Sequence, residues 1–244
     1  MRKSFYTIAS LSLILMSLAV CGQTVTNQKE RDERVQAFLL KNKSKWRDLN
    51  VPYEDGQILH DLIVKNKYTS ALEIGTSTGH STVWIAWALS KTGGKLITIE
   101  IDPERHKKAL ENLKAVGLSE FVDARLADAH ELVKELEGPF DFVFSDADKS
   151  WYTQYFKDVQ HKLSVGACFT AHNVNNNFSG VDDFMEYVRS MKNFETSVVG
   201  SRGEGISGRD ESRSRGSGDG DDGPSLRGAC VRRCRQARRS AGAI

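Results

Sequence analysis

Several short apolar segments of this 244-residue chain each end in a polar side chain that could take part in chemistry. Carboxylates accept hydrogen bonds from hydroxyl, amino and ammonium groups, and a carboxylate beside an imidazole can hold a divalent cation or move a proton. If these segments are neighbouring strands of one sheet, their ends meet at one edge. The polar ends, in chain order, are Glu73, Glu100, Asp128, Asp146 and His172.

The first of these ends belongs to a glycine-containing loop with the sequence EIGTSTGHS. Gly75 and Gly79 allow the backbone to approach a ligand closely. The dinucleotide fingerprint G-x-G-x-x-G is absent, because Ser77 and His80 stand where it requires other residues. Glu73 carries a carboxylate suited to an ammonium group. The same pattern also fits an ordinary turn between a strand and a helix.

The next two ends are acidic as well. Glu100 follows an apolar segment, and an acidic side chain at that point can accept both hydroxyls of a ribose. Asp128 could accept a hydrogen bond from an adenine amino group. With Glu73 they suggest a nucleoside-like ligand that has a cationic amino-acid end. Taken singly, each of these acids is equally compatible with a solvated surface position.

The fourth end combines Asp146, Asp148 and Lys149. Two carboxylates beside a lysine could hold a divalent cation and place a general base. The following apolar segment ends in His172 and Asn173, so neighbouring parallel strands would bring Asp146 close to an imidazole and an amide oxygen. Three protein ligands would leave coordination positions on the cation for substrate oxygens. The alternative is a helix-capping aspartate with an ordinary loop.

Short β-branched segments alternate with amphipathic segments between residues 26 and 200. This alternation predicts an α/β fold with a doubly wound, mostly parallel sheet and helices on both faces. Ligands bind such sheets at the carboxyl ends of the strands. The predicted strands are 70–74, 95–99, 121–127, 140–145, 167–171 and 194–199. The predicted helices are 29–46, 56–67, 81–90, 103–116, 129–136, 151–163 and 181–191.

These motifs together resemble the cation-dependent O-methyltransferases that use S-adenosylmethionine, the catechol and caffeoyl-coenzyme A group. The resemblance covers about residues 47 to 200 and implies a Rossmann-like class I methyltransferase fold. Its most specific part is the segment FDFVFSDADK. The matching motifs, in order, are Val51, residues 73–81 (EIGTSTGHS), 97–100 (ITIE), 128–129 (DA) and 140–149 (FDFVFSDADK).

The resemblance implies a role for each matching residue. Lys149 would be the general base, and Asp146, His172 and Asn173 would bind a divalent cation of the magnesium or manganese class. The family normally has Asp where this chain has His172, and imidazole favours transition metals over magnesium. Trp151 stands where many members have a smaller polar residue, which predicts a different acceptor pocket. The implied S-adenosylmethionine-binding residues are Val51, Glu73, Gly75, Thr76, Gly79, Ser81, Glu100, Asp128, Ala129 and Asp146.

The charge balance limits the partners that can be expected. Lys and Arg number 34 against 32 Asp and Glu, so the net charge of +2 argues against a general nucleic-acid binder. We expect a small hydroxylated acceptor and no nucleic acid, and the sequence leaves a homodimer open. Four Cys are too few for a disulfide scaffold, and Cys168 is expected as a buried, inert thiol. His130 lies on a helical pattern and is expected at the surface.

The first 21 residues resemble a secretory signal, with Arg2 and Lys3 before an apolar segment. Cleavage, lipid attachment at Cys21 and retention as an N-terminal membrane anchor are all compatible with this segment. The segment predicts an exported protein that is periplasmic or membrane-anchored. The location would be cytoplasmic if the segment is not a signal.

Residues 201–244 differ in composition from the rest of the chain and are rich in Arg, Gly and Ser. Such a segment cannot bury enough apolar surface to offset its ordering entropy, so a disordered tail is expected. The sequence then leaves open whether the edge strand that completes the methyltransferase sheet is lost. Two alternatives to an active methyltransferase follow, a catalytically impaired cofactor- or metal-binding envelope protein and an interaction protein that acts through its tail.

Overall fold

The computed structural model describes residues 27–46, 48–174, 178–200 and 227–234. The chain divides into two compact units, Met1–Ser44 and Lys45–Ile244. The described part of the first unit forms a helix over residues 27–41. No helix among the described residues is long and apolar enough to cross a membrane. The predicted export signal, residues 1–21, lies outside the described residues.

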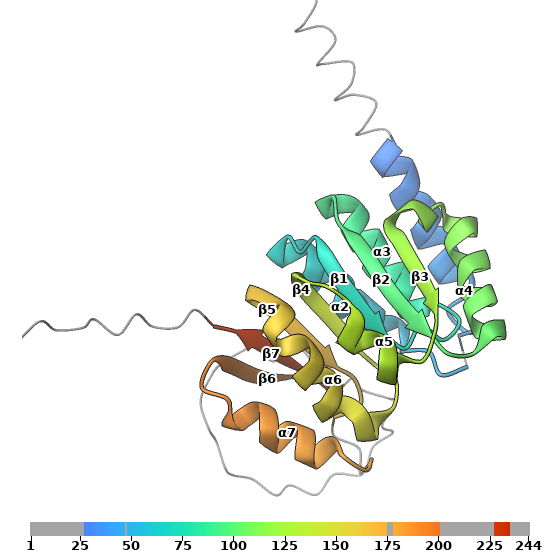
Figure 1. Cartoon of the computed structure of the whole chain (residues 1–244). Helices are drawn as coiled ribbons and strands as arrows, with labels where there is room; N and C mark the ends of the chain where they lie inside the picture. Colours follow the sequence, from blue (N-terminus) through green and yellow to red (C-terminus); the bar gives the residue numbers. More distant parts are fainter. Residues whose placement is uncertain (1–26, 47, 175–177, 201–226, 235–244) are drawn as a thin grey trace, which may run out of the picture. The chain divides into compact units, whose positions relative to one another are not determined.

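A seven-stranded sheet organises the second unit, in the order β3-β2-β1-β4-β5-β7-β6 (Figure 1). Strands β1 to β5 pair in parallel, whereas β7 runs antiparallel to both of its neighbours. The predicted doubly wound, mostly parallel sheet is therefore confirmed. The strands are β1 Ser70–Ile74, β2 Lys95–Glu100, β3 Val122–Leu126, β4 Phe140–Ser145, β5 Leu163–Ala171, β6 Phe194–Gly200 and β7 Arg227–Arg233.

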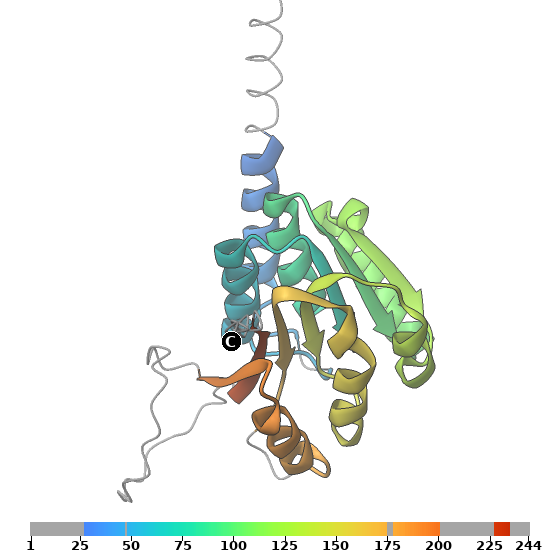
Figure 2. The same ribbon diagram turned by 60° about the vertical axis from the view of Figure 1, so that its left-hand side comes forward.

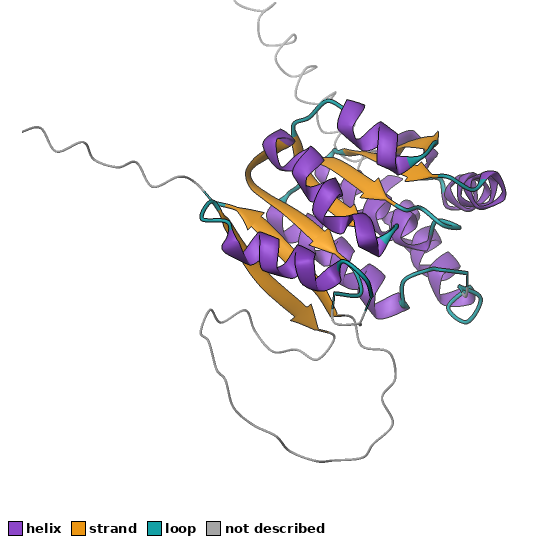
Figure 3. Cartoon of the chain, turned by 60° about the horizontal axis from the view of Figure 1, so that its bottom comes forward, coloured by secondary structure: helices purple, strands orange, loops and turns teal. Residues whose placement is uncertain are grey.

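Helices lie on both faces of this sheet (Figure 3). The predicted helix over residues 151–163 is shorter than expected and is flanked by 3₁₀ turns at Lys149–Trp151 and Gln160–Lys162. A further 3₁₀ turn at Ser119–Phe121 leads into β3. The helices are α2 Tyr53–Asn66, α3 His80–Thr92, α4 Pro103–Val116, α5 Ala129–Glu135, α6 Tyr152–Val159 and α7 Val181–Ser190.

Local sequence explains the helix boundaries. The carboxylate of Asp102 accepts hydrogen bonds from the backbone N–H groups of Glu104 and Arg105 at 2.8 and 3.0 Å, which caps the start of α4. Gly117 ends α4 in the left-handed conformation that glycine adopts without strain. The predicted boundaries of this helix are therefore confirmed.

Two apolar cores, one on each face, fix the helices to the sheet. Phe142 and Phe144 of β4 pack with α2 and α3, whereas Val143 between them packs with α6 and α7. This alternation follows from the two-residue period of a strand. It explains why the whole segment FDFVFS is apolar apart from Asp141 and its last residue.

Register aligns the carboxyl ends of the parallel strands. Ile74 at the end of β1 pairs with Ile99 of β2 and with Ser145 of β4. Ser145 in turn pairs with Ala171, the last residue of β5. The residues that follow these positions therefore emerge along one edge of the sheet, as the sequence predicts.

The expectation of a disordered tail is wrong for residues 227–233, which form β7 between β5 and β6 (Figure 2). The C-terminal strand that the sequence left in doubt is thus present, and it lies inside the sheet instead of at its edge. Cys168 of β5 forms a disulfide with Cys230 of β7, so the expectation of an inert thiol is wrong as well. Cross-strand pairing, which depends on residues far apart in the chain, overrides the weak local preference of the segment RGACVRR.

Candidate functional site

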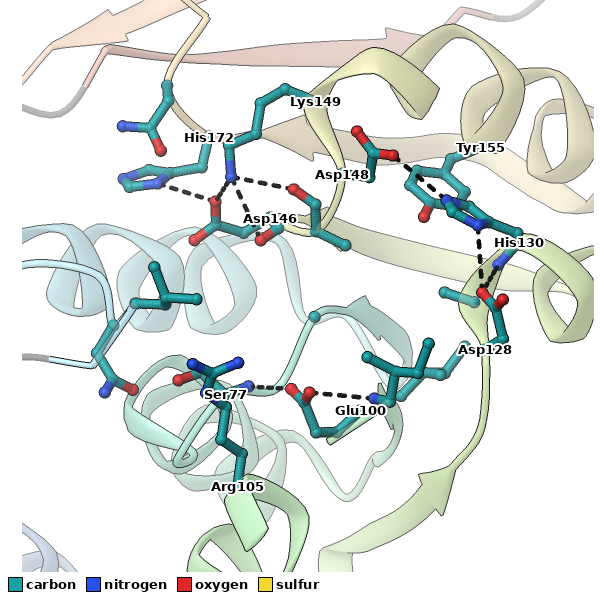
Figure 4. Close-up of a pocket in the computed structure, with 18 of the residues that line it drawn as sticks. Ser77, Glu100, Arg105, Asp128, His130, Asp146, Asp148, Lys149, Tyr155 and His172 are labelled. Atoms are coloured by element: carbon teal, nitrogen blue, oxygen red, sulfur yellow. Dashed lines mark hydrogen bonds and ion pairs between the residues drawn. The ribbon is translucent and has the colours of Figure 1, made fainter. Parts of the chain in front are cut away.

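A cavity of about 620 Å³ lies at the carboxyl edge of the sheet (Figure 4). Its walls come from the loops that follow β1 to β5, which is the location predicted from the strand ends. Most of the predicted site residues line it, namely Gly75, Glu100, Asp128, Ala129, Asp146, Lys149, His172 and Asn173.

The glycine loop brings two strand ends into contact. Gly75 follows β1 with φ of 98°, a conformation that disfavours other residues. A Cβ atom on Gly75 would lie 2.9 Å from the backbone oxygen of Asp146. Glycine therefore permits the close approach of the β1 and β4 loops that forms the floor of the cavity.

Glu73 is completely buried behind this loop and does not line the cavity. Its Oε2 accepts hydrogen bonds from the hydroxyls of Thr82 and Thr98, both at 2.6 Å. Burial raises the pKa of Glu73 to about 7, although the hydrogen bonds act in the opposite direction. The carboxylate is therefore close to its titration midpoint at neutral pH, and a nearby cation would favour its ionised form.

Glu100 forms the opposite wall, at the end of β2 (Figure 4). Its Oε2 accepts from the backbone N–H of Ser77 at 2.6 Å. Its Oε1 accepts from the backbone N–H groups of Ile101 and Asp102 at 3.1 and 2.9 Å. Three neutral donors fix the carboxylate in place, and a carboxylate has roughly four acceptor positions, so it can still accept from a ligand.

At the β3 end, Asp128 caps α5 and contacts the ring of His130, with 3.3 Å between Oδ1 and Nδ1. Nε2 of the same ring lies 3.6 Å from Oδ2 of Asp148. The His130 ring stacks on Trp151, with 4.0 Å between ring centroids. His130 is half-buried and also lines the cavity, a position that the expectation of a surface residue did not include.

Charged side chains gather where β4 and β5 end. Nζ of Lys149 lies 2.7 Å from Oδ1 of Asp146. The same oxygen lies 3.2 Å from Nδ1 of His172, and Nε2 of that ring lies 3.0 Å from Oδ2 of Asp55. Burial lowers the pKa of His172, but the two carboxylates outweigh it and raise the pKa to about 9.

The backbone holds this cluster rigidly. The N–H of His172 donates to the carbonyl of Ser145 at 3.1 Å, and the hydroxyl of Tyr152 donates to the carbonyl of His172 at 3.0 Å. Asn173 follows with φ of 57°, in the left-handed region, as the chain turns away from β5. The side chains of this wall are therefore placed by strand ends rather than by a free loop.

The predicted metal ligands can be tested against these contacts. Within the part of the chain that the structure describes, no three His, Cys, Asp or Glu side chains are grouped to hold a metal. The predicted set has only two, Asp146 and His172, with the Asn173 amide as the third ligand. Nδ1 of His172 is buried and lacks a well-aligned hydrogen bond to any described residue. A divalent cation with mixed nitrogen and oxygen ligands fits this pair of atoms if it replaces the proton between Nδ1 and the Asp146 carboxylate.

The other predicted cofactor residues do not line the cavity, and one of them, Val51, contacts the ring of His80. His80 Nδ1 donates to the carbonyl of Val51 at 2.7 Å, and burial lowers the pKa of His80 to about 4, so the ring stays neutral. Its Nε2 accepts from Nε1 of Trp84 at 3.1 Å. The predicted residues that do not line the cavity are Val51, Glu73, Thr76, Gly79 and Ser81.

Sequence reasoning missed several residues of the site. Asn50 and Arg105 line the cavity, and Arg105 forms two hydrogen bonds with Asp48 at its rim, at 3.0 and 3.1 Å. Asp55 was missed although it contacts His172. In the sequence it directly precedes the predicted helix 56–67, where an acid is usually a solvated carboxylate. Only the packing of α2 against the sheet edge reveals its burial.

The sequence model of a family described as O-methyltransferase matches residues 24–195. Among the curated relatives, a catechol O-methyltransferase of Niastella koreensis is 38% identical over 130 residues, which cover 52% of this chain and 58% of the relative. Caffeoyl-CoA O-methyltransferase 1 of Eucalyptus globulus is 29% identical over 161 residues, or 62% and 65% of the two chains. The chain thus spans less than two thirds of the length of these relatives.

Solved structures share the fold. An O-methyltransferase from Bacillus cereus in complex with SAH superposes with a TM-score of 0.61 at 23% identity, covering 82% of this chain and 88% of that one. A putative O-methyltransferase from Klebsiella pneumoniae gives 0.64 at 23% identity, with 82% and 90% covered. These similarities agree with the class I methyltransferase architecture of the sheet.

Proposed function

The chain belongs to the O-methyltransferase family, and from this premise we propose that it transfers the methyl group of S-adenosylmethionine to a hydroxyl of a small, catechol-like acceptor. The observation that carries the proposal is that one cavity joins two chemically different walls. One wall presents the carboxylate of Glu100, which accepts hydrogen bonds. The other presents the ion-paired cluster of Asp146, Lys149 and His172.

The cofactor would lie along the β1 and β2 ends. Gly75 lets the β1 and β4 loops meet beneath the ligand, and Glu100 keeps about one acceptor position for a ribose hydroxyl. Asp128 and Ala129 border the same cavity at the β3 end, where an adenine ring would fit. Glu73, behind the loop, would be ionised by the ammonium group of the methionine end. When bound, the cofactor supplies an electrophilic methyl group on a sulfonium.

The acceptor would bind at the β4 and β5 ends. Asp146, His172 and Asn173 would hold a divalent cation, which supplies Lewis acidity toward a hydroxyl whose pKa is otherwise about 10. Nζ of Lys149 lies beside Asp146 in the cavity wall and would accept the proton of that hydroxyl. The cavity walls align acceptor and donor and exclude part of the solvent, which accounts for a further share of the rate.

An assay with catechol and S-adenosylmethionine, with and without magnesium or manganese, tests this function. We expect methylated catechol and demethylated cofactor in equal amounts, with a higher rate when the cation is present. Calorimetric titration with S-adenosylmethionine provides the second measurement. Cofactor binding without methyl transfer to catechol would favour the impaired binding protein instead, and no binding at all would overturn the family-based assignment of the cofactor.

We also propose that the protein is exported. Its support is the signal-like sequence of the first 21 residues. A disulfide between Cys168 and Cys230 agrees with an oxidising compartment. Fractionation of cells that produce the full chain would test the location, and recovery of the uncleaved chain in the cytosol would contradict it.

A further inference from the structure

Asp55 is a buried carboxylate to which neither the fold nor the sequence motifs assign a role. It lies in the first turn of α2, is 1% exposed and is not among the residues that line the cavity. Its Oδ2 is 3.0 Å from Nε2 of His172, which is also buried. A buried carboxylate is costly unless it is paired, so this contact needs an explanation.

The contact with Asp55 gives the two ring nitrogens of His172 different roles. A carboxylate accepts hydrogen bonds and does not donate them, so Nε2 carries a proton and donates a hydrogen bond to Asp55. Nδ1 is turned toward Oδ1 of Asp146 at 3.2 Å, without the alignment of a hydrogen bond, so a cation bound there would take the place of a proton between these two atoms. An imidazole whose far nitrogen donates to a carboxylate presents its near nitrogen as a cation ligand in a fixed orientation.

We propose that Asp55 is a positioning residue that orients His172 and directs Nδ1 to the cation held with Asp146. The inference rests on the proposed function, because it requires the divalent cation assigned there to these side chains. Asp55 touches neither the cation nor the substrate. It fixes the ring and adds a negative charge one imidazole away, which strengthens the ligand.

A purely structural role is the alternative, in which the pair only fastens α2 to the end of β5. The two roles differ in measurable ways. A structural tie would affect the free energy of unfolding and leave cation affinity in the folded protein unchanged. A positioning residue would change cation affinity even under conditions where the variant is fully folded.

Titration of the full-length protein with Mn²⁺, followed through free Mn²⁺ by electron paramagnetic resonance, tests the proposal directly and needs no turnover. Loss of a carboxylate that orients a metal-bound histidine costs about 10- to 100-fold in affinity. We expect Asp55→Asn to weaken Mn²⁺ binding by about tenfold and Asp55→Ala by more, because Asn still offers an acceptor oxygen. The matched control is Asp61→Asn, an exposed acid of the same helix, which should bind Mn²⁺ as the wild type does.

In a protein that already carries His172→Asp, the expected effect of Asp55→Asn on Mn²⁺ affinity has the opposite sign. In His172→Asp the ring is gone, and Asp55 would face a second buried carboxylate instead of a donor. Adding Asp55→Asn to His172→Asp should therefore strengthen or preserve Mn²⁺ binding, whereas it weakens binding in the wild-type background. Equal weakening in both backgrounds would overturn the proposal, as would an Asp55→Asn variant that binds Mn²⁺ within twofold of the wild type.

A spectroscopic test covers the case in which the Asp55 variants do not fold. In the wild-type protein labelled with ¹⁵N-histidine and loaded with Zn²⁺, we expect Nε2 of His172 to keep its proton and Nδ1 to lose it. The opposite tautomer would overturn the orientation that the proposal requires. If the wild type binds neither cation, the metal-assisted part of the proposed function fails together with this inference. If it binds them and the variants behave as wild type, only the role of Asp55 fails.

Discussion

On the β2 side of the cavity, the carboxylate of Glu100 is held by backbone N–H groups, whereas on the β4 and β5 side Asp146 is held by charged side chains. Backbone donors are neutral and cannot move away, so the Glu100 wall is already formed before a ligand binds. Lys149 and His172 are side chains that can change their partner when a ligand or a cation binds. The Glu100 wall is therefore suited to binding the cofactor, and the Asp146 wall is suited to the chemical step.

This difference predicts that changes on the two sides will affect different measurements. Substitutions on the charged side should act on turnover and cation affinity. Substitutions on the backbone-supported side should act on cofactor affinity and on the stability of the cofactor-free protein.

The largest effect is expected for Lys149→Ala. Removal of the proposed general base should lower turnover by about 10²-fold or more, the range measured for acid–base groups. Cofactor affinity, measured by calorimetry, should change little because Lys149 lies on the opposite wall from Glu100. Unchanged turnover would remove Lys149 from the base role and weaken the distinction between the walls.

The second prediction concerns Glu73 and the pH dependence of stability. Its pKa in the folded protein is about 7 against an ordinary value of 4.5, so the folded state binds the proton more tightly than the unfolded state. The stability that this proton provides is complete below pH 4.5 and is lost as pH rises to 7. We expect a loss of roughly 3 kcal/mol over this interval, at about 1.4 kcal/mol per pKa unit.

Glu73→Gln should remove that slope from the free energy of unfolding of the cofactor-free protein, measured with urea at several pH values. Glu104→Gln, at the exposed start of α4, is the matched control and should keep the wild-type slope. A Glu73→Gln variant with the full wild-type slope would assign the pH dependence to other groups.

A smaller effect is expected for Glu100→Gln. The amide would present a donor where a backbone N–H now donates, so one buried hydrogen bond would be lost at a cost of about 1–3 kcal/mol. The dissociation constant for S-adenosylmethionine should rise by roughly tenfold, which corresponds to about 1.4 kcal/mol. Calorimetry measures the change, and turnover at saturating cofactor should stay close to wild type. A fall in turnover with unchanged affinity would contradict the assignment of this wall to binding.

The smallest effect is expected for Asp48→Asn at the rim. The pair with Arg105 is half exposed, and such ion pairs contribute about 1 kcal/mol or less. Cofactor dissociation should become a few times faster at low salt, and the difference should shrink at high salt because the pair is screened. Stopped-flow measurement at two salt concentrations checks this. A large, salt-independent effect would mean that the rim belongs to the rigid wall.

The order of strands and helices was predictable because each element carries its own pattern. The helix Pro103–Val116 has a capping aspartate before it and a glycine after it, and the strand Phe140–Ser145 is apolar on both faces. β7 was missed for the opposite reason. Its residues have little local strand preference, and its place depends on backbone pairing with β5 and β6.

The residues of the site also separate into those that the sequence predicted and those that it missed. The residues at strand ends were predicted to share one edge, and the structure places Glu100, Asp146 and His172 around one cavity. Asp55 comes from a helix start, where an acid usually faces solvent. Its burial depends on how α2 packs in the fold, which no short-range pattern encodes. The roles of the predicted residues remain predictions.

The position of β7 has a consequence for the synthesis of the protein. β5 and β6 are both translated before β7, yet neither pairs with the other in the finished sheet. While the ribosome is still translating the intervening residues 201–226, the backbone groups along the outer edge of β5 have no partner strand. Such an open edge can recruit strands from other nascent chains. Release of the chain before residue 227 would make that exposure permanent, so truncated products should aggregate rather than accumulate as folded protein.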